Sequence, residues 1–425
     1  MTVLSDADGG WATPQLELAA AAGANIDVGR RTLLGDRQQP GADMAGEFEE
    51  IGHSGGKITF EVVTDENGRE GYQMSYSSSR PVPMVLTGVW ALVQSGIPVS
   101  TYNVAGPDGP PFPGCVAVLV ASDSEGKFGH HCPACAGYWR SGPWSNVCPY
   151  CAVQLEPYEF LSRAQRRYVR HYCEVWIGAM SADDARDVTI DMDAVADAAG
   201  SSAEKPSFYV SEESQQHKFT CRACDEFNDI LGRFGFCSRC GTRNDLMDFE
   251  DRIVPVIRDR LNAGASPSDC VRDGVAAVDT FIAQYAKALV LLVPMVERRR
   301  KRLTGSRFHD LVEVRDVFSK YFGIDICRGM QADEVEFVSR LFHRRHVYEH
   351  NGGEVDERYL KESRDTTVRL KQHIRETQQD GHRLMNLLVK MARNLHKGFH
   401  EIIPPLPKPI QAFEDKKARI AQYRQ

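Results

Sequence analysis

The sequence predicts a multidomain α+β protein with a small α+β module, two four-cysteine segments and an all-α C-terminal region. Its 425 residues exceed what one ordinary hydrophobic core accommodates. Four cysteines near residue 140 recur 89 positions later with the same spacing, and from about residue 246 onward apolar residues recur at helical intervals. A hydrophobic content of 42% and a charged content of 26% are typical of a globular chain.

The N-terminal part is predicted to begin with a flexible segment, because residues 1–45 are rich in Ala, Gly and Asp and show poor periodicity. Residues 46–125 are expected to form the small α+β module. Within it, alternating apolar residues in 57–77 surround an Asp-Glu-Asn-Gly turn and predict a hairpin. Residues 83–96 are interpreted as a short helix, and the apolar run 115–123 as a buried strand.

Two cysteine segments, residues 126–155 and 216–245, share the pattern Cys-x2-Cys-x12-Cys-x2-Cys. Each Cys-x2-Cys turn directs two thiolates at one centre, and two such turns complete a tetrahedral metal site. Both segments resemble zinc ribbons, so we expect two structural zinc ions per chain. The expected ligands are Cys132, Cys135, Cys148, Cys151, Cys221, Cys224, Cys237 and Cys240.

The zinc sites are expected to be structural, since four thiolates leave no open coordination position for chemistry. An alternative is that one ribbon also contacts nucleic acid or a protein partner, through aromatic and arginine side chains that stack on bases. The candidates are Trp139, Arg140 and Trp144 in the first ribbon and Arg233 and Phe234 in the second.

Residues 156–215 are predicted to contain an arginine-bearing helix (156–180) and an acidic linker (182–215) that joins the ribbons. Residues 246–403 are predicted to be a helical domain, and 404–425 a tail after a Pro-rich stop. Helix breaks are expected at the glycines of this region: Gly264, Gly305, Gly323, Gly352, Gly353 and Gly381.

The charge of the chain is unevenly distributed. Residues 261–425 hold 29 Lys and Arg against 22 Asp and Glu, a surplus of +7; the totals of 51 and 58 leave 22 against 36, or −14, for residues 1–260. A basic C-terminal part is compatible with a polyanionic partner.

The expected location is the cytoplasm, because the first twenty residues lack a basic start followed by an apolar run. Residues 275–296 form the longest apolar stretch, but Asp279, Gln284 and Lys287 interrupt it. We therefore expect a buried helix there rather than a membrane span.

An Arg-His segment, RRHVYEH at residues 344–350, ends a predicted helix that covers 332–350. His346 and His350 are four residues apart, so their imidazoles lie on one helix face. Asn351 and two glycines then supply a helix stop, which places His350 at the negative end of the helix dipole, where a protonated imidazole is favoured. Such a histidine is suited to general acid or base chemistry near neutral pH.

The spacing Arg345-His346-x3-His350 resembles the Arg-polar-x3-His motif of HEPN domains, and the trailing Val355-Asp356 and Tyr359 strengthen the likeness over about 266–400. The resemblance implies an all-helical, typically dimeric fold that in many members is a metal-independent ribonuclease. Its active site forms where the motif helices of two protomers meet. Arg345 and His350 are about 140° apart around a helix, which is consistent with a pocket that needs two copies.

The resemblance further implies that a ribose 2′-hydroxyl attacks its own phosphodiester. His350 would move the proton, Arg345 would hold the phosphate, and His346 would orient or assist. The expected partners are RNA, with tRNA as one candidate, a second copy of the chain, and a phage or antitoxin protein. Proteins with this combination of domains are usually bacterial toxins or antiphage effectors, and no membrane partner is expected.

Three alternatives remain open for the Arg-His segment. It can be a structural helix end, since basic residues complement the dipole. The chain can be a non-enzymatic zinc-ribbon adaptor with an inactive HEPN dimerisation domain. The letters His346-x-x-Glu349-His350 also spell the zinc motif of inverted zincins, which need a third ligand downstream.

The basic run ERRRKRL at residues 297–303 follows the apolar helix and can either be a solvated helix end or bind phosphates near the Arg-His segment. The arginines along 163–171 are a weaker second candidate. The expected nucleic-acid contacts are Arg298, Arg299, Arg300, Lys301, Arg302 and Arg344.

Overall fold

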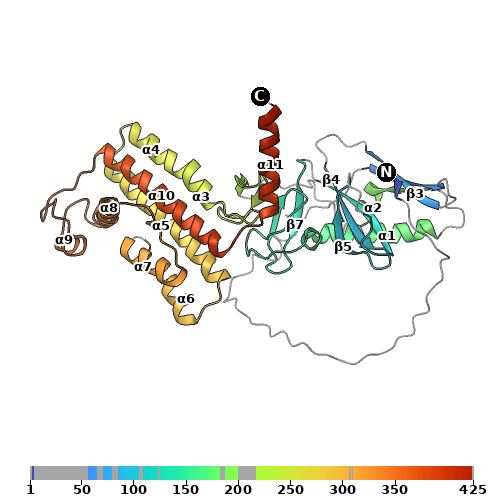
Figure 1. The fold of residues 1–425 in the computed structure, drawn as a ribbon, viewed down its shortest axis with the longest axis horizontal. Helices are drawn as coiled ribbons and strands as arrows, with labels where there is room; N and C mark the ends of the chain where they lie inside the picture. Colours follow the sequence, from blue (N-terminus) through green and yellow to red (C-terminus); the bar gives the residue numbers. More distant parts are fainter. Residues whose placement is uncertain are drawn as a thin grey trace. The chain divides into compact units, whose positions relative to one another are not determined.

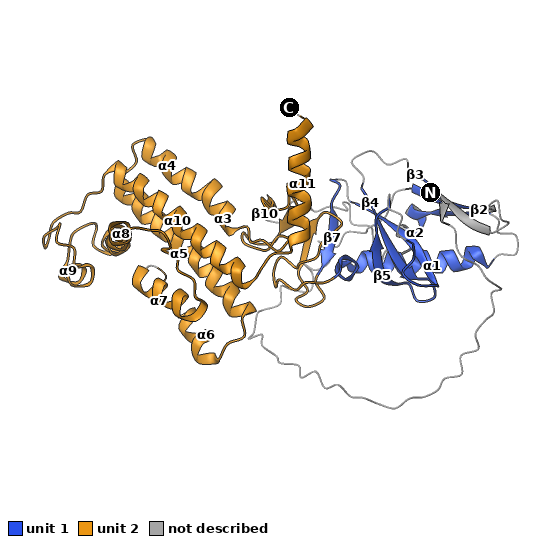
Figure 2. Cartoon of the chain, in the orientation of Figure 1, with its two compact units in different colours: residues 1–131, 156–214 blue, residues 132–155, 215–425 orange. Residues whose placement is uncertain are grey.

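The structure is a computed structural model that describes residues 2–3, 56–64, 70–78, 85–104, 109–122, 125–181, 187–199, 217–305, 308 and 310–423. The chain divides into two compact units, residues 1–131 with 156–214 and residues 132–155 with 215–425 (Figure 2). Both cysteine segments therefore belong to the same unit as the helical region. The flexible segment expected for 1–45 lies outside the described residues, except for two residues in a strand.

The first unit is built from two antiparallel sheets, ordered β1-β3-β2-β9 and β5-β4-β6, and from helices (Figure 1). Its elements are β1 (Thr2–Val3), β2 (Gly56–Thr64), β3 (Glu70–Ser78), β4 (Leu86–Leu92), β5 (Ile97–Tyr102), β6 (Cys115–Ala121), β7 (Phe128–His131), a 3₁₀ turn η2 (Pro157–Phe160), α1 (Arg163–Met180), β9 (Asp187–Asp191) and α2 (Met192–Ala199). Tyr168 and Tyr172 of α1 are fully buried in the core, which also contains Val89 of β4 and Val118 of β6.

Several expectations for this unit are confirmed. β2 and β3 pair as the predicted hairpin, from Gly56 opposite Ser78 to Thr64 opposite Glu70. The predicted strand at 115–123 is β6, and the predicted arginine-bearing helix is α1. All four arginines of α1 are exposed, although Arg166 donates to the Glu159 carbonyl at 2.7 Å.

Two expectations for this unit are wrong. Residues 83–96 contain the strand β4 rather than a helix, because β4 pairs with β5 on one edge and β6 on the other. The predicted acidic linker contains regular elements, since 187–191 form β9, which pairs with β2, and 192–199 form α2. A short, mostly apolar segment such as 86–92 suits either a helix or a strand, and distant partners decide between them.

The second unit combines the two cysteine segments with a helical region. Its elements are β8 (Tyr138–Ser141), β10 (His217–Thr220), β11 (Phe227–Ile230), α3 (Asp245–Asp248), a π-helical turn η3 (Phe249–Ile253), α4 (Val254–Asn262), α5 (Pro267–Leu292), α6 (Glu297–Thr304), α7 (Leu311–Phe322), α8 (Ala332–His350), α9 (Glu357–Ser363), α10 (Gln378–Ile402) and α11 (Pro407–Tyr423).

Helix α5 forms the centre of the helical core and packs against α4, α8 and α10. Among the described residues, it is the one helix long and apolar enough to cross a membrane, with a mean hydropathy of 1.5 over its most apolar window. Eleven of its residues are buried against neighbouring helices, as in the core helix of a globular fold.

Most of the predicted helix breaks fall at helix ends. Gly323 follows α7 with φ 68°, a conformation that favours glycine and ends the helix. Gly381 is an exception, because it lies inside α10, where a Cβ would come within 2.8 Å of the Leu261 side chain. This glycine therefore allows close packing of α10 on α4 rather than a break. Within the predicted tail, residues 407–423 form the helix α11, none of whose residues is buried.

Candidate functional site

Each Cys-x2-Cys pair lies in a tight turn of the same geometry. The residue after the second cysteine has a positive φ and donates its N–H to the carbonyl of the first cysteine. These residues are Ala136, Ala152, Asp225 and Gly241, with φ of 58°, 59°, 63° and 80° and N–O distances of 2.9, 3.0, 2.9 and 2.9 Å. A positive φ costs a non-glycine residue on the order of 1 kcal/mol. Because this conformation recurs at the same position of all four turns, we infer that the turn is needed to direct the two thiols of each pair toward one centre.

The sulfur atoms of each set lie within 4.8 Å of one another. The Sγ–Sγ distances are 3.7 Å for Cys132–Cys151, 3.6 Å for Cys135–Cys148, 3.7 Å for Cys221–Cys240 and 3.5 Å for Cys224–Cys237. Four sulfurs around one zinc ion at the usual Zn–S length of about 2.3 Å are about 3.8 Å apart. Both sets therefore fit a tetrahedral zinc ion, whose coordination the four thiolates would fill.

The two cysteine segments contact each other as a pair with approximate two-fold symmetry. Strands β8 and β11 are antiparallel neighbours. The Val147 N–H donates to the Ser238 carbonyl at 2.8 Å, and the Phe236 N–H donates to the Pro149 carbonyl at 2.9 Å. Since Phe236 and Ser238 are the residues 89 positions after Val147 and Pro149, the two hydrogen bonds are equivalent. The two copies of the repeated sequence thus form two similar structures that pair with each other through equivalent residues.

A buried ion pair lies on this approximate two-fold axis. Arg140 is opposite Asp229, its own counterpart 89 positions later, and Nη1 of Arg140 is 2.9 Å from Oδ2 of Asp229. Their side chains are 2% and 0% exposed. Trp139 is also fully buried, and its Nε1 donates to Ser145. The expectation that Trp139 and Arg140 contact nucleic acid is therefore wrong, because both side chains hold the ribbon pair together.

The two cysteine sets differ in their exposure to solvent. All four cysteines of the second set are buried, whereas in the first set Cys135 is exposed and Cys151 is half-buried. The second set is also tied to the helices, because the Leu406 N–H donates to the Cys240 carbonyl at 2.8 Å. The first site is thus the more accessible of the two.

A buried polar network joins the second ribbon to the helical core. Arg243 forms two 2.9 Å contacts with Asp245 and lies over the ring of Tyr285. The Tyr285 hydroxyl is 2.7 Å from Nδ1 of His396, and the Arg243 N–H donates to Nε2 of His400 at 3.3 Å. Burial, and then the nearby His400 and Arg243, lower the pKa of His396 to about 3. Both histidines are therefore neutral in the folded protein near pH 7, since burial also lowers the pKa of His400.

Arg345, His346 and His350 lie together near the C-terminal end of α8. The rings of His346 and His350 are 4.5 Å apart between centroids, and the His350 side chain is 58% exposed. Arg345 is half-buried and its Nη2 is 3.0 Å from Oε1 of Glu349. The segment is therefore open to solvent, and the carboxylate of Glu349, which is not part of the Arg-polar-x3-His motif, holds the guanidinium of Arg345.

The surroundings of His346 favour its neutral form. Burial lowers the pKa of His346, electrostatic interactions with His350 and Arg358 lower it further, and those with Glu362 and Asp356 act in the opposite direction. An imidazole that stays neutral near pH 7 can accept a proton. Helix α9 carries most of these charged groups, since Arg358 and Glu362 lie in it. Asp356 is its N-cap residue and accepts a hydrogen bond from the Tyr359 N–H at 2.7 Å.

Arg344 has a structural role instead of the expected contact with nucleic acid. Its side chain is buried, with Nη2 2.8 Å from Asp365 and Nη1 2.9 Å from Glu376. The Tyr359 hydroxyl is 3.2 Å from its Nε. Burial lowers the pKa of Arg344, but Glu376 and Asp365 more than offset this and raise it overall. The guanidinium thus fixes residues 365–376 to α8 and has no phosphate-binding surface.

The basic run lies on α6 and is mostly exposed. Arg298, Arg299, Lys301 and Arg302 are exposed and Arg300 is half-buried. Arg302 forms an ion pair with Glu313 at 3.2 Å. An exposed row of cations suits both a solvated helix and a phosphate-binding surface, so this expectation stays a prediction.

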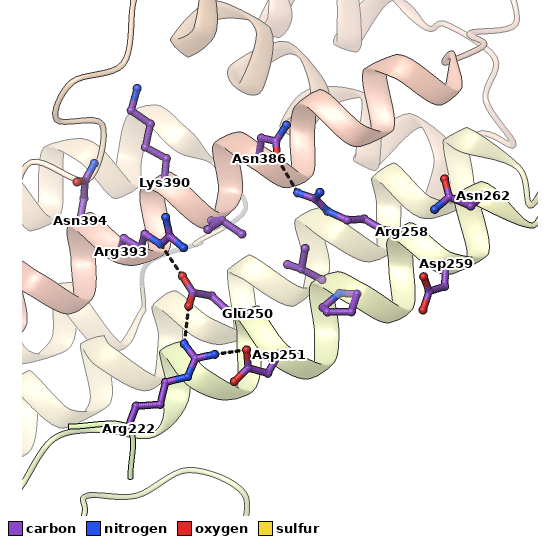
Figure 3. Close-up of a pocket in the computed structure, with 13 residues that line it drawn as sticks. Arg222, Glu250, Asp251, Arg258, Asp259, Asn262, Asn386, Lys390, Arg393 and Asn394 are labelled. Carbon is purple, nitrogen blue, oxygen red and sulfur yellow. Dashed lines mark hydrogen bonds and ion pairs between the residues drawn. The ribbon is translucent and has the colours of Figure 1, made fainter. Parts of the chain in front are cut away.

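A polar groove of about 910 Å³ lies beside η3 and α4 on one side and α10 on the other (Figure 3). Four cationic side chains line it: Arg222, Arg258, Lys390 and Arg393. This groove could not be predicted from the sequence, because Arg222 and Arg393 are 171 residues apart.

Among the described residues, the two cysteine sets are the groups of three or more His, Cys, Asp or Glu side chains arranged to hold a metal. No third ligand accompanies His346 and His350 in this part of the chain, which disfavours the zincin alternative. In comparisons with protein-family models, curated proteins and solved structures, none matches the chain.

Proposed function

We propose that the chain is a metal-independent endoribonuclease of HEPN type that acts as a toxin or antiphage effector in the cytoplasm. The observation that carries this proposal is the shared position of Arg345, His346 and His350 at an exposed helix end, where the centroids of the two imidazoles are 4.5 Å apart and their planes are tilted by 57°. Cation and imidazole groups at one exposed place suit cleavage of a phosphodiester by the ribose 2′-hydroxyl.

The roles follow from the local environment. His346, whose pKa is lowered, is the group suited to accept the proton of the 2′-hydroxyl. His350 is exposed at the helix end and suited to deliver a proton to the leaving oxygen. Arg345 would bind the phosphate and stabilise its developing charge, once the phosphate displaces Glu349 from the guanidinium.

A second copy of the chain would complete the site. On one helix Arg345 and His350 are about 140° apart at 100° per residue, so they do not enclose a phosphate. Two copies of α8 that meet across a two-fold axis would place both kinds of group around one phosphate. The paired ribbons, each with one zinc ion, would stabilise this unit, and their exposed parts are candidates for binding the target or the trigger.

Cleavage by matched variants tests the proposal. Zinc-loaded protein is incubated with tRNA in buffer without added divalent metal, and the products are resolved on a denaturing gel. The wild type should cut, while His350→Ala and Arg345→Ala should be slower by about 100-fold or more, a typical cost of losing an acid-base group. The control His373→Ala removes another exposed histidine and should cut like the wild type. Equal cutting by all four proteins would refute the site.

The second candidate function is a non-enzymatic adaptor that binds a protein or nucleic acid through its ribbons. It is favoured by the rigid ribbon pair, which the Arg140–Asp229 ion pair holds together. Expression in a bacterial host separates the two, since only an enzyme predicts that wild type harms growth and His350→Ala does not.

A further inference from the structure

We propose that the groove between the η3–α4 segment and α10 binds a small phosphorylated ligand of nucleotide size. The groove holds about 910 Å³, within the range of small-molecule sites. Its cations come from three parts of the unit, because Arg222 lies in the turn between Cys221 and Cys224, Arg258 in α4, and Lys390 and Arg393 in α10. This site is separate from the ribonuclease proposed above.

One covered carboxylate holds two exposed guanidiniums at the groove. Glu250 is 2.8 Å from Nη1 of Arg222 and 2.6 Å from Nε of Arg393, as Figure 3 shows. The Glu250 side chain is only 12% exposed, whereas Arg222 and Arg393 are 51% and 66% exposed. A guanidinium has five N–H donors, so both retain donors for a phosphate while Glu250 fixes their position.

Hydrogen bonds and an ion-pair contact fix the other two cations of the groove, Arg258 and Lys390. Nη2 of Arg258 donates to Oδ1 of Asn386 at 2.6 Å. Nζ of Lys390 donates to the Gly329 carbonyl at 2.5 Å and is 3.4 Å from Glu334. Preorganised side chains lose little entropy on binding, which favours a ligand with several anionic oxygens.

The backbone at the groove is irregular for a reason visible in the sequence. Pro255 has no N–H, and its ring would clash with the carbonyl four residues earlier, so an α-helix does not continue unchanged through this point. The chain instead forms the π-turn Phe249–Ile253, which contains Glu250 and its neighbour Asp251, a second partner of Arg222. Such π-turns inside helices occur frequently at functional sites.

The charge balance selects a small ligand over a nucleic-acid strand. The four cations face three carboxylates, Glu250, Asp251 and Asp259, which leaves a net charge of +1. A long polyanion needs a larger cationic surplus, whereas two or three phosphates can use the fixed guanidiniums. The exposed carboxylates can accept hydrogen bonds from ribose hydroxyls, and Val254, Pro255 and Val389 offer apolar surface for a base.

The groove contacts the start of α8 and lies far from the Arg-His segment. Lys390 reaches Glu334, whose carboxylate also accepts the N–H of Gln331 at 2.9 Å in the first turn of that helix. His350 is 16 residues further along, about 24 Å at 1.5 Å per residue. A ligand here would therefore bind without touching the proposed catalytic groups.

Titration calorimetry on the zinc-loaded full chain tests the proposal, with ADP, pyrophosphate and adenosine as probes. ADP should bind most tightly, pyrophosphate more weakly, and adenosine not measurably. Arg393→Ala and Arg258→Ala should each weaken ADP binding at least tenfold, while Arg419→Ala on α11 should bind like the wild type.

Three outcomes would overturn the proposal. One is the absence of binding heat with ADP and pyrophosphate at millimolar concentration. Another is unchanged ADP binding by both groove variants, with folding verified by circular dichroism. The third is tighter binding of a 20-nucleotide RNA that depends on Arg393 and Arg258, which would assign the groove to nucleic acid. None of these readouts depends on RNA cleavage, so the proposed ribonuclease stands or falls separately.

Discussion

The ion pair between Arg140 and Asp229 should be essential for the ribbon pair. Asp229→Ala leaves the guanidinium of Arg140 in a place where its side chain is only 2% exposed. Removal of one member of a buried ion pair costs about 3–5 kcal/mol, because the remaining charge has neither its partner nor water. Since about 1.4 kcal/mol is a factor of ten, the folded state of the ribbons should become disfavoured by roughly two to three and a half orders of magnitude.

The approximate two-fold symmetry provides a matched control. Arg140→Asp and Asp229→Arg alone each place two like charges on the axis and should destabilise the ribbons at least as much as Asp229→Ala. The double variant exchanges the two residues between equivalent positions and restores an opposite-charge pair. It should therefore recover most of the lost stability, which defines a coupling free energy in a double-mutant cycle.

The assay is urea unfolding of the zinc-loaded protein, followed by zinc release with a chromogenic chelator, which reports on the cysteine segments specifically. The wild type and the exchanged double variant should release zinc at similar urea concentrations, and the single variants much earlier. The reasoning is refuted if Asp229→Ala lies within about 1 kcal/mol of the wild type, or if the double variant is as unstable as the singles.

Three more predictions concern pH, metal and RNA. In the folded protein the pKa of His396 is lowered to about 3, so below pH 6.5 the unfolded chain binds a proton at His396 that the folded protein does not. The free energy of unfolding therefore decreases as the pH decreases. The wild type should lose about 1.6 kcal/mol of unfolding free energy through His396 between pH 6.5 and pH 5, and His396→Gln should lack this loss in urea unfolding. An unchanged pH dependence of the unfolding free energy in the variant would contradict this. Zinc should leave the first site before the second during chelator titration, because Cys135 is exposed, and simultaneous release would contradict the difference in access. Glu349→Gln frees Arg345 and should strengthen RNA binding severalfold by fluorescence anisotropy; an unchanged affinity would show that the ion pair does not compete with phosphate.

Local patterns in the sequence predict the local parts of this structure well. The Cys-x2-Cys spacing predicts the four similar turns, and the alternation around residues 57–77 predicts the β2–β3 hairpin. The glycine at 323 predicts the end of α7 because only the local backbone conformation is involved. Each of these features depends on residues that are close in the sequence.

Features that depend on distant partners could not be predicted. Arg344 and Arg345 are neighbours with the same chemistry, yet Asp365 and Glu376 bury the first and leave the second half-exposed. The spacing of the cysteines in the 89-residue repeat predicts two similar ribbons, but the spacing alone does not indicate that they contact each other. The opposite charges of Arg140 and Asp229 at equivalent positions are the one signal that could have indicated the pairing.

The chemical ends of the RNA products test the central claim most directly. Purified protein is incubated with a single-stranded RNA, and with DNA of the same sequence, in buffer without added divalent metal. The account predicts RNA fragments with 2′,3′-cyclic phosphate and 5′-hydroxyl ends, intact DNA, and no fragments from His350→Ala. Intact RNA with the wild type, 5′-phosphate ends, or equal cutting by His350→Ala would contradict it.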